Sequence, residues 1–125
     1  MPKPLPPRPM RSAFDAGVYV IRSASSARVY VGATRCRLSA RLVAHWSALR
    51  HGRHPNQALQ REWDRTGGES FAFEVVERVA PEELAALGER EAWWMDRLGA
   101  HDPATGYNSQ PGGMSLGPRR VPWVA

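Results

Sequence analysis

The stretch GVYVIRS at residues 17–23, joined by ASSA at 24–27 to RVYVG at 28–32, decides the fold of this chain. Both outer segments are rich in β-branched and aromatic residues, which favour strands. The linking residues are few and mostly polar, so the two segments predict an antiparallel hairpin. If Ser23 pairs with Arg28, then Ile21 faces Tyr30, and Tyr19 lies on the same side one diagonal step away. A slip of one residue would place the two tyrosines on opposite faces.

Three helices and a further strand are predicted after the hairpin. Apolar residues recur at helical spacing with proline or glycine at the borders, whereas the run FAFEVVERV is typical of a strand. The expected ranges are a helix over 38–50, a helix over 55–66, a strand over 71–79 and a helix over 81–98. The order β-β-α-α-β-α predicts an α+β fold, in which a small three-stranded antiparallel sheet is flanked by helices.

The charge of the chain favours an anionic partner. The 125 residues suffice for one domain, and 17 Lys and Arg stand against 12 Asp and Glu, which gives a formal net charge of +5. Of the basic residues only Lys3 is a lysine, and the arginine fork binds phosphate through two hydrogen bonds. A genome rich in G and C would also favour arginine codons, but it would not produce the net positive charge. The charge therefore favours a polyanionic, phosphate-bearing partner.

Cysteine content and the terminal segments bear on the compartment. The single cysteine, Cys36, excludes a disulfide within the chain, and one cysteine with four irregularly spaced histidines is no usual structural zinc set. No segment is long and apolar enough for a membrane span or a signal peptide, so we expect a cytoplasmic protein without a membrane partner. Residues 1–14 are expected to form a proline-rich extended or disordered arm, residues 15–112 the domain, and residues 113–125 an irregular basic tail.

The helix predicted over 81–98 carries a carboxylate within its apolar stripe. At about 100° per residue, Glu91 falls in the middle of a face formed by leucines, Trp94 and Met95. A carboxylate buried there without a partner would cost several kcal/mol, so something must compensate it. The compensation could be an arginine, a hydrogen-bond network or a metal ion. A structural ion pair is the commoner solution, whereas a metal ion would make Glu91 part of a functional site.

The helix predicted over 38–50 has polar residues close to its core face. Leucines and Trp46 form that face, and Arg41 and His45 lie together beside it because they are four residues apart. An arginine and a histidine in this position could both bind one phosphate. The alternative is a surface arginine and a histidine whose hydrogen bond goes to a nearby carbonyl group.

Several short motifs in this order resemble the GIY-YIG family of nucleases. The similarity extends over residues 16–112 and includes the segment at 54–63, which resembles that of members of the phage homing type. The motifs are GVY at 17–19, YVG at 30–32, Arg41 with His45 one turn later, ERE at 89–91 followed by AWW, and GYN at 106–108. Valine replaces isoleucine in the first two motifs, a common conservative change.

The resemblance implies an endonuclease that hydrolyses DNA phosphodiester bonds. It implies a one-step reaction, in which an activated water attacks the phosphorus in line with the departing 3′ oxygen. It also implies one divalent ion, Mg²⁺ or Mn²⁺, held by Glu91 together with waters and substrate oxygens. Such a site suits magnesium, which keeps several waters and takes few protein ligands.

The resemblance also implies roles for further residues. Tyr19 would help to deprotonate the attacking water, with His45 as a possible relay. Tyr30 and Arg41 would stabilise the charge that develops on the phosphoryl oxygens. Asn108 would orient the phosphate or the Glu91 side of the site.

Other residues are expected to support the site or the grip on DNA. Gly17 and Gly32 would be architectural, because a missing side chain lets backbone or substrate approach closely. Charged residues around the first helix could contact the DNA backbone, although each could equally be a solvated surface group: Arg35, Arg37, Arg50, Arg53 and His54.

Two other function classes stay open beside the nuclease. One is a catalytically weak nucleic-acid-binding module, against which the intact motif residues argue. The other is a purely structural or protein-interaction domain, with Trp93 and the tail residue Trp123 as anchors. For a nuclease we expect low intrinsic sequence specificity, because one small domain leaves no room for a second DNA-binding unit.

Overall fold

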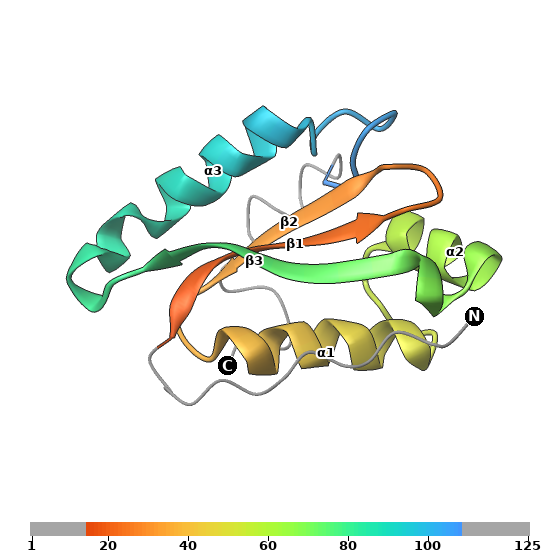
Figure 1. The fold of residues 1–125 in the computed structure, drawn as a ribbon, viewed down its shortest axis with the longest axis horizontal. Coiled ribbons are helices and arrows are strands. Elements are labelled where there is room, and N and C mark those ends of the chain that lie inside the picture. Colours follow the sequence, from red (N-terminus) through yellow and green to blue (C-terminus); the bar gives the residue numbers. More distant parts are fainter. Residues whose placement is uncertain (1–14, 109–125) are drawn as a thin grey trace.

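Strands β1 (Ala16–Ser23) and β2 (Val29–Thr34) form the predicted hairpin in this computed structural model, which describes residues 15–108. The backbone N–H of Ser23 donates to the carbonyl oxygen of Arg28 at 3.0 Å, and Ile21 pairs with Tyr30. The predicted register is therefore confirmed. Strand β3 (Phe71–Val79) pairs with the other side of β1, which gives an antiparallel sheet of order β2-β1-β3 (Figure 1).

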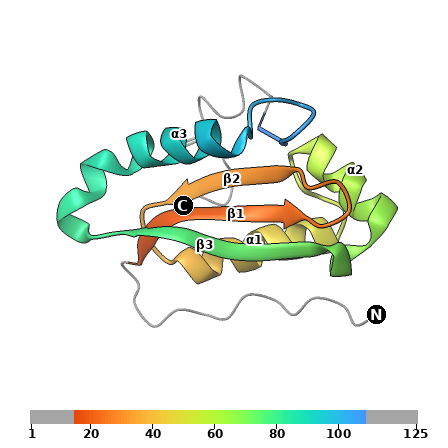
Figure 2. The same ribbon diagram turned by 45° about the horizontal axis from the view of Figure 1, so that its top comes forward.

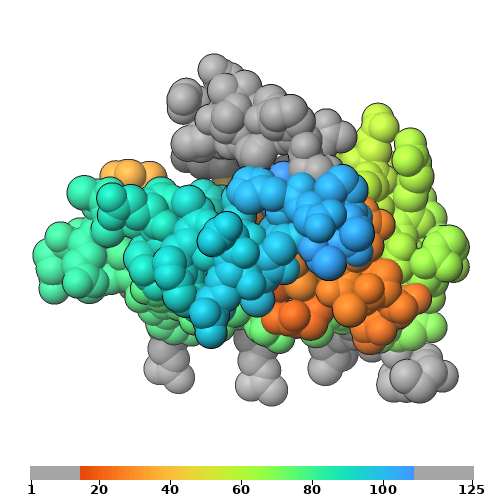
Figure 3. All heavy atoms as spheres, turned by 90° about the horizontal axis from the view of Figure 1, so that it is seen from above, coloured from red at the N-terminus to blue at the C-terminus, as the bar shows by residue number. Residues whose placement is uncertain are grey.

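Helices cover both faces of the sheet. Helix α1 (Leu38–Arg50) runs below the sheet and α3 (Leu87–Leu98) above it in Figure 1, and Figure 2 shows α3 alongside β2, the edge strand. Helix α2 (Gln57–Thr66) lies at the end of the sheet where the hairpin turns. Figure 3 looks onto the upper face, where α3 and the segment after it cover the sheet. The predicted α+β fold and element order are confirmed.

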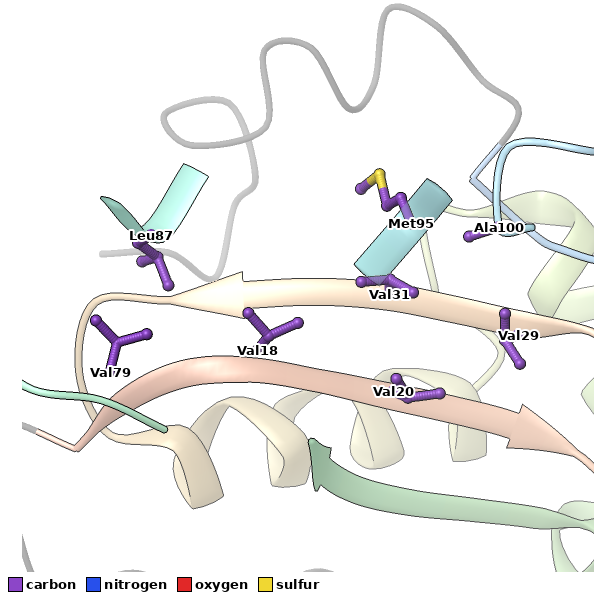
Figure 4. Packing of buried hydrophobic residues seen from close by; sticks show 8 residues of the cluster. All are labelled: Val18, Val20, Val29, Val31, Val79, Leu87, Met95 and Ala100. Atoms are coloured by element: carbon purple, nitrogen blue, oxygen red, sulfur yellow. The ribbon is translucent and has the colours of Figure 1, made fainter. Parts of the chain in front are cut away.

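Alternation along β1 and β2 separates two sides of the core. The side toward α3 is aliphatic, with valines from both strands packed on two residues of α3 (Figure 4): Val18, Val20, Val29, Val31, Leu87 and Met95. The alternate residues Tyr19 and Ile21 point to the other side, where they pack with leucines of α1 and α2. Because side chains alternate between the faces of a strand, Tyr19 and Tyr30 share the α1 side.

Two helix boundaries differ from the prediction. Helix α2 begins at Gln57 rather than at residue 55, because the side chain of Asn56 accepts a hydrogen bond from the N–H of Leu59 and caps the helix. The helix predicted over 81–98 is a 3₁₀ segment over Pro81–Ala86 followed by α3. The backbone of Ala86 has φ −89° and ψ −1°, which lie outside the α-helical values. The 3₁₀ turns, which are tighter than α-helical turns, end at this residue, and α3 begins after it.

Some predictions concern residues outside the described range. The arm predicted over 1–14, the tail predicted over 113–125 and the predicted domain end at residue 112 lie outside residues 15–108. Within the described range, no helix has the length and apolar character needed to cross a membrane. Cys36 is exposed.

Candidate active site

The phenol of Tyr19 extends over the neighbouring strand because Gly32 has no side chain. The two residues are cross-strand partners in the hairpin. A Cβ atom added at Gly32 would lie 2.5 Å from Cζ of Tyr19 and would collide with the Tyr19 hydroxyl oxygen. Any larger residue at this position would therefore displace the ring. Gly32 thus determines where the hydroxyl of Tyr19 lies.

Gly17 permits a bulge just before Tyr19. The register between β1 and β3 shifts between Val18 and Tyr19. A Cβ atom at Gly17 would collide with the backbone carbonyl of Glu77 and would lie 3.0 Å from Cα of Arg78. Backbone atoms cannot move aside as a flexible side chain can, so only glycine allows β3 this close. These contacts fit the architectural role predicted for both glycines.

Four rings meet on the α1 side of the sheet. The hydroxyl oxygen of Tyr19 lies 2.6 Å from Nε2 of His45, and Nδ1 of His45 lies 2.8 Å from Nε2 of His54. The two imidazole rings are stacked with centroids 5.0 Å apart, and Tyr30 meets both of them edge-on at 5.3 and 5.9 Å. A continuous chain of hydrogen bonds therefore leads from Tyr19 through His45 to His54.

Burial keeps all four rings uncharged at neutral pH. It lowers the pKa of His45 well below its usual value and lowers the pKa of His54 to about 4. It raises the pKa of Tyr30 to about 12 and the pKa of Tyr19 well above its usual value. The physical cause is the loss of water, which disfavours each charged form. The cluster consequently consists of neutral imidazoles and neutral phenols.

Arg41 contributes the positive charge of the cluster. It lies on α1, one turn before His45, and is 6% exposed. Its charge opposes the effect of burial and lowers the pKa of Tyr19, Tyr30 and Glu91. The sequence predicts Arg41 and His45 beside the core face of α1, but both belong to its buried residues. The cluster, rather than solvent, therefore surrounds this arginine.

Glu91 reaches the cluster from α3. Burial raises its pKa to about 7, and the charge of Arg41 acts in the opposite direction. The charge of Glu91 in turn raises the pKa of Tyr19 and Tyr30, so groups on β1, β2, α1 and α3 lie within electrostatic reach of one another. No ion pair among residues 15–108 includes Glu91. The cation whose charge acts on Glu91 is Arg41.

A hard divalent cation fits this carboxylate. Within residues 15–108, no three His, Cys, Asp or Glu side chains are grouped so that they could hold a metal ion. Magnesium needs only one or two carboxylates because it keeps several waters. A carboxylate whose ionised form is disfavoured by burial gains stability from a nearby cation. A single carboxylate such as Glu91 could hold one divalent cation together with several waters.

Asn108 closes the outer edge of β2. Its Oδ1 accepts a hydrogen bond from the N–H of Val31 at 2.8 Å, and its Nδ2 donates to the carbonyl oxygen of Val31 at 2.9 Å. Two residues earlier on β2, the carbonyl oxygen of Val29 accepts a hydrogen bond from the N–H of Tyr107 at 2.8 Å. The GYN segment thus extends the sheet beside Tyr30. Both ends of the Asn108 amide are hydrogen-bonded to the backbone of Val31, the residue that follows Tyr30. Asn108 can therefore hold Tyr30 in place by fixing the backbone of β2.

The four arginines predicted to contact DNA flank α1. Arg35 and Arg37 precede the helix, Arg50 and Arg53 lie at its far end, and all four are exposed. None of them takes part in an ion pair among the described residues. His54, predicted with them as a possible DNA contact, is only 5% exposed and belongs to the ring cluster instead.

Asn56 and Gln60 form hydrogen bonds that hold His54 in place, and neither residue was predicted as part of the site. The backbone N–H of Asn56 donates to Nδ1 of His54 at 3.0 Å. Oε1 of Gln60 accepts a hydrogen bond from the N–H of His54 at 2.9 Å, while its Nε2 donates to the carbonyl oxygen of Leu49. The residue type of Asn56 could have predicted that it caps α2, because asparagine before a helix is a typical N-cap.

Phenols, an arginine and a carboxylate within electrostatic reach of one another are groups with which proteins hydrolyse phosphate esters. Residues 15–108 match the model of the GIY-YIG catalytic domain. The chain therefore belongs to the GIY-YIG family, and it is an endonuclease. A comparison with curated protein sequences finds no match.

Two solved structures are similar to this chain over most of its length. One is a mutant of the catalytic domain of the intron endonuclease I-TevI, with 28% sequence identity and a TM-score of 0.65 over 76% of this chain and 93% of that one. The other is the catalytic domain of the homing endonuclease I-TevI, with 28% identity and a TM-score of 0.63 over 74% and 95%. The likeness thus covers nearly the whole of that catalytic domain, as the motifs predict.

Proposed function

We propose that this protein is a metal-dependent endonuclease that hydrolyses DNA phosphodiester bonds by a one-step attack of an activated water. One observation carries the proposal. Tyr19, Arg41 and Glu91 lie far apart in the sequence and on different elements, yet the charges of Arg41 and Glu91 both change the pKa of Tyr19. The likeness to an intron-encoded homing endonuclease supports DNA as the substrate.

Tyr19 is the residue proposed to activate the water. In hydrolysis a bond forms between the water oxygen and phosphorus as the bond to the 3′ oxygen breaks, and the water gives up a proton. Because burial raises the pKa of Tyr19, its phenolate must be favoured by neighbours before it can accept that proton. The charge of Arg41 and its hydrogen bond to Tyr19 both act in that direction.

Arg41 and Tyr30 are proposed to stabilise charge on the phosphoryl oxygens. The planar fork of an arginine matches two phosphate oxygens at once. Burial raises the pKa of Tyr30 to about 12, so its hydroxyl keeps its proton and can donate a hydrogen bond. Donors held in place before the reaction stabilise developing charge without reorganising.

Glu91 is the residue proposed to hold Mg²⁺ or Mn²⁺. When bound there, the ion would offset the carboxylate charge and stabilise the negative charge of the leaving oxygen. Offsetting the charge of Glu91 also removes one of the causes that raise the pKa of Tyr19. Glu91 therefore links metal binding to the state of the tyrosine.

The exposed arginines at both ends of α1 are proposed to bind the DNA backbone. They lie on either side of the helix that carries Arg41, and they form no ion pair within the described range. Contacts with phosphates position a duplex but do not read its sequence. We therefore propose low intrinsic sequence specificity.

Cleavage of DNA with and without divalent metal tests the proposed function. Supercoiled plasmid, linear duplex, single-stranded DNA and a branched duplex are each incubated with the protein in Mg²⁺ or in EDTA. We expect cleavage in Mg²⁺ that EDTA abolishes, and no cleavage by Glu91→Gln, which keeps the size of the side chain. Cleavage by this variant at the wild-type rate would refute the role of Glu91, and intact DNA under every condition would favour a binding module.

A further inference from the structure

We propose that the hydrogen-bond chain behind Tyr19 has a fixed direction, set by the backbone N–H of Asn56. In this direction His54 donates to His45, and His45 donates to the hydroxyl oxygen of Tyr19. The meaning for catalysis rests on the proposed function of Tyr19, but the direction itself can be measured without DNA or metal.

The direction follows from one group that can only donate. The N–H of Asn56 points at Nδ1 of His54 at 3.0 Å, so this nitrogen must be the acceptor and carries no hydrogen. A neutral imidazole has one N–H, which therefore lies on Nε2 of His54. This N–H donates across 2.8 Å to Nδ1 of His45, which leaves the hydrogen of His45 on Nε2. Nε2 of His45 then donates to Tyr19 across 2.6 Å.

This direction requires both histidines to be neutral, and their surroundings keep them so. Burial is the main cause that lowers the pKa of both rings, and for His54 the pKa is about 4. A second proton on His54 would occupy Nδ1 and oppose the N–H of Asn56. A second proton on His45 would bring charge close to Arg41, whose own charge lowers the pKa of His45.

The group that sets the direction is itself held firmly. Oδ1 of Asn56 accepts from the N–H of Leu59 at 3.0 Å and caps α2, while its Nδ2 donates to the carbonyl oxygen of Tyr107 at 2.6 Å. Gln60 holds the backbone of His54 through a hydrogen bond of 2.9 Å. The position of the Asn56 N–H is therefore determined by the start of a helix and not by a mobile side chain.

The direction decides what His45 can do for Tyr19. With its Nε2 nitrogen protonated, His45 cannot accept the proton of the Tyr19 hydroxyl. It donates a hydrogen bond to that oxygen and so stabilises the phenolate once the proton has left. The hydroxyl hydrogen of Tyr19 consequently points away from His45. In this arrangement His54 and Asn56 are positioning residues that act through His45.

Nitrogen NMR of the imidazole rings in the full chain measures the direction. Protonated and unprotonated ring nitrogens have widely different ¹⁵N shifts, so a long-range ¹H–¹⁵N correlation at neutral pH identifies each tautomer. We expect His45 and His54 both to carry hydrogen on Nε2, with a coupling across the hydrogen bond between Nε2 of His54 and Nδ1 of His45. Hydrogen on Nδ1 of His45 would overturn the proposal, whether or not the protein cuts DNA.

Two variants of similar size at His54 test the consequence. The side-chain nitrogen of glutamine can donate to His45 in place of Nε2, so His54→Gln should keep hydrogen on Nε2 of His45 and cleave at a rate close to wild type. The carboxylate in His54→Glu can only accept, so hydrogen should move to Nδ1 of His45. Single-turnover cleavage should then fall about 10–100-fold, the effect typical of losing the hydrogen-bond partner that orients a functional histidine.

The comparison of the two variants separates direction from packing. Equal loss of cleavage in both variants would show that only the shape of His54 matters, and wild-type cleavage by His54→Glu would show that His45 works as an acceptor. Either result overturns the proposal. A wild-type protein that cuts no DNA would instead refute the proposed function, while the ring-nitrogen shifts would still decide the direction.

Discussion

Gly32 shows how one missing side chain sets the position of a reactive group. Its place in the hairpin opposite Tyr19 leaves room for the phenol, and a Cβ atom there would lie 2.5 Å from Cζ of that ring. Because the ring is also hydrogen-bonded to His45, a shift would disturb the whole ring cluster. The space above Gly32 is therefore part of the active site although glycine has no functional group.

The substitution Gly32→Ala should displace Tyr19 and reduce single-turnover cleavage by about 10²-fold, since a misplacement of about 1 Å can have that effect. Gly88→Ala is the matched control, because Gly88 is exposed on α3 and a Cβ atom there would meet nothing within 4 Å. The control should cleave normally and gain up to about 1 kcal/mol of stability from helix propensity. Full activity of Gly32→Ala would show that the position of the ring is not critical.

Glu91 couples the stability of the metal-free protein to pH. Its pKa is raised from 4.5 to about 7 in the folded state, so the neutral carboxyl is the form that folding favours. The stability that this group contributes is fully present below pH 4.5 and is lost as the pH rises through about 7. Above that pH the ionised carboxylate destabilises the fold unless a cation accompanies it.

The variant Glu91→Gln should therefore be more stable than wild type above pH 7 in EDTA, by roughly 3 kcal/mol, since each pKa unit corresponds to about 1.36 kcal/mol. The two proteins should be equally stable below pH 4.5, where Glu91 is protonated in both the folded and the unfolded state. Chemical denaturation at several pH values measures the difference, and added Mg²⁺ should reduce it. An equal difference at every pH would mean that ionisation of Glu91 is not its cause.

In the segment after α3, a side chain forms the hydrogen bonds that a further strand would form with the outer edge of β2. Asn108 uses both ends of its amide to pair with Val31, where a further strand would otherwise supply an N–H and a carbonyl. This pairing covers part of the edge of β2, the strand that carries Tyr30. The edge of the sheet and the active site thus depend on the same contact.

Removal of the amide in Asn108→Ala should destabilise the protein by about 1–3 kcal/mol for each buried backbone group left unpaired. The amide hydrogen of Val31 should then exchange with solvent faster. Thr105→Ala is the control in the same segment, because it removes only an exposed hydrogen bond to the carbonyl oxygen of Gly99. Unchanged exchange at Val31 in Asn108→Ala would contradict the role of the amide in closing the edge.

Elements with a regular local pattern could be predicted from the sequence. The alternation in residues 17–32 predicted the hairpin and its register, and the bounds of α1 and β3 match the prediction. The split before α3 could not be predicted, since the apolar pattern continues across Ala86 while its backbone departs from helical values. The local sequence therefore does not predict the residue at which a 3₁₀ segment is followed by an α-helix.

The candidate site was predictable only where motif residues mark it. Helical periodicity already marked Arg41 and Glu91, the family resemblance added Tyr19, and the charges of Arg41 and Glu91 both act on the pKa of Tyr19. His54 was predicted as a surface contact because its burial results from long-range packing against Tyr30 and His45. The role of the Asn56 backbone could not be predicted, because a backbone N–H leaves no trace in residue identity.

The distribution of charge over the described domain suits a polyanion. Ion pairs engage Arg22, Arg65, Arg78 and Arg90, whereas the exposed arginines around α1 take part in none among residues 15–108. Four exposed arginines outside these ion pairs therefore lie at the two ends of the helix that carries Arg41, while Arg61 and Arg97 lie on α2 and α3. Binding that depends on such contacts should release counterions and weaken as salt increases.

Affinity for an unrelated duplex should accordingly fall steeply with salt when measured in Ca²⁺, which we expect to permit binding with little cleavage. Replacing Arg50 and Arg53 by alanine should reduce the slope of log affinity against log salt by about 1 for each phosphate that is no longer bound. Arg97→Ala is the charge-matched control for each of the two single replacements, since Arg97 lies over Trp93 and is exposed on α3. An affinity that does not change with salt would favour a protein-interaction role.

The most direct test of the account is single-turnover cleavage by Tyr19→Phe at saturating protein. This variant keeps the ring over Gly32 and loses only the hydroxyl that lies 2.6 Å from His45. Loss of a group that activates water typically reduces the rate about 10²–10⁴-fold, while DNA affinity in Ca²⁺ should change little because the arginines dominate binding. We predict this fall with an unchanged affinity, and cleavage as fast as wild type would contradict the assignment of Tyr19.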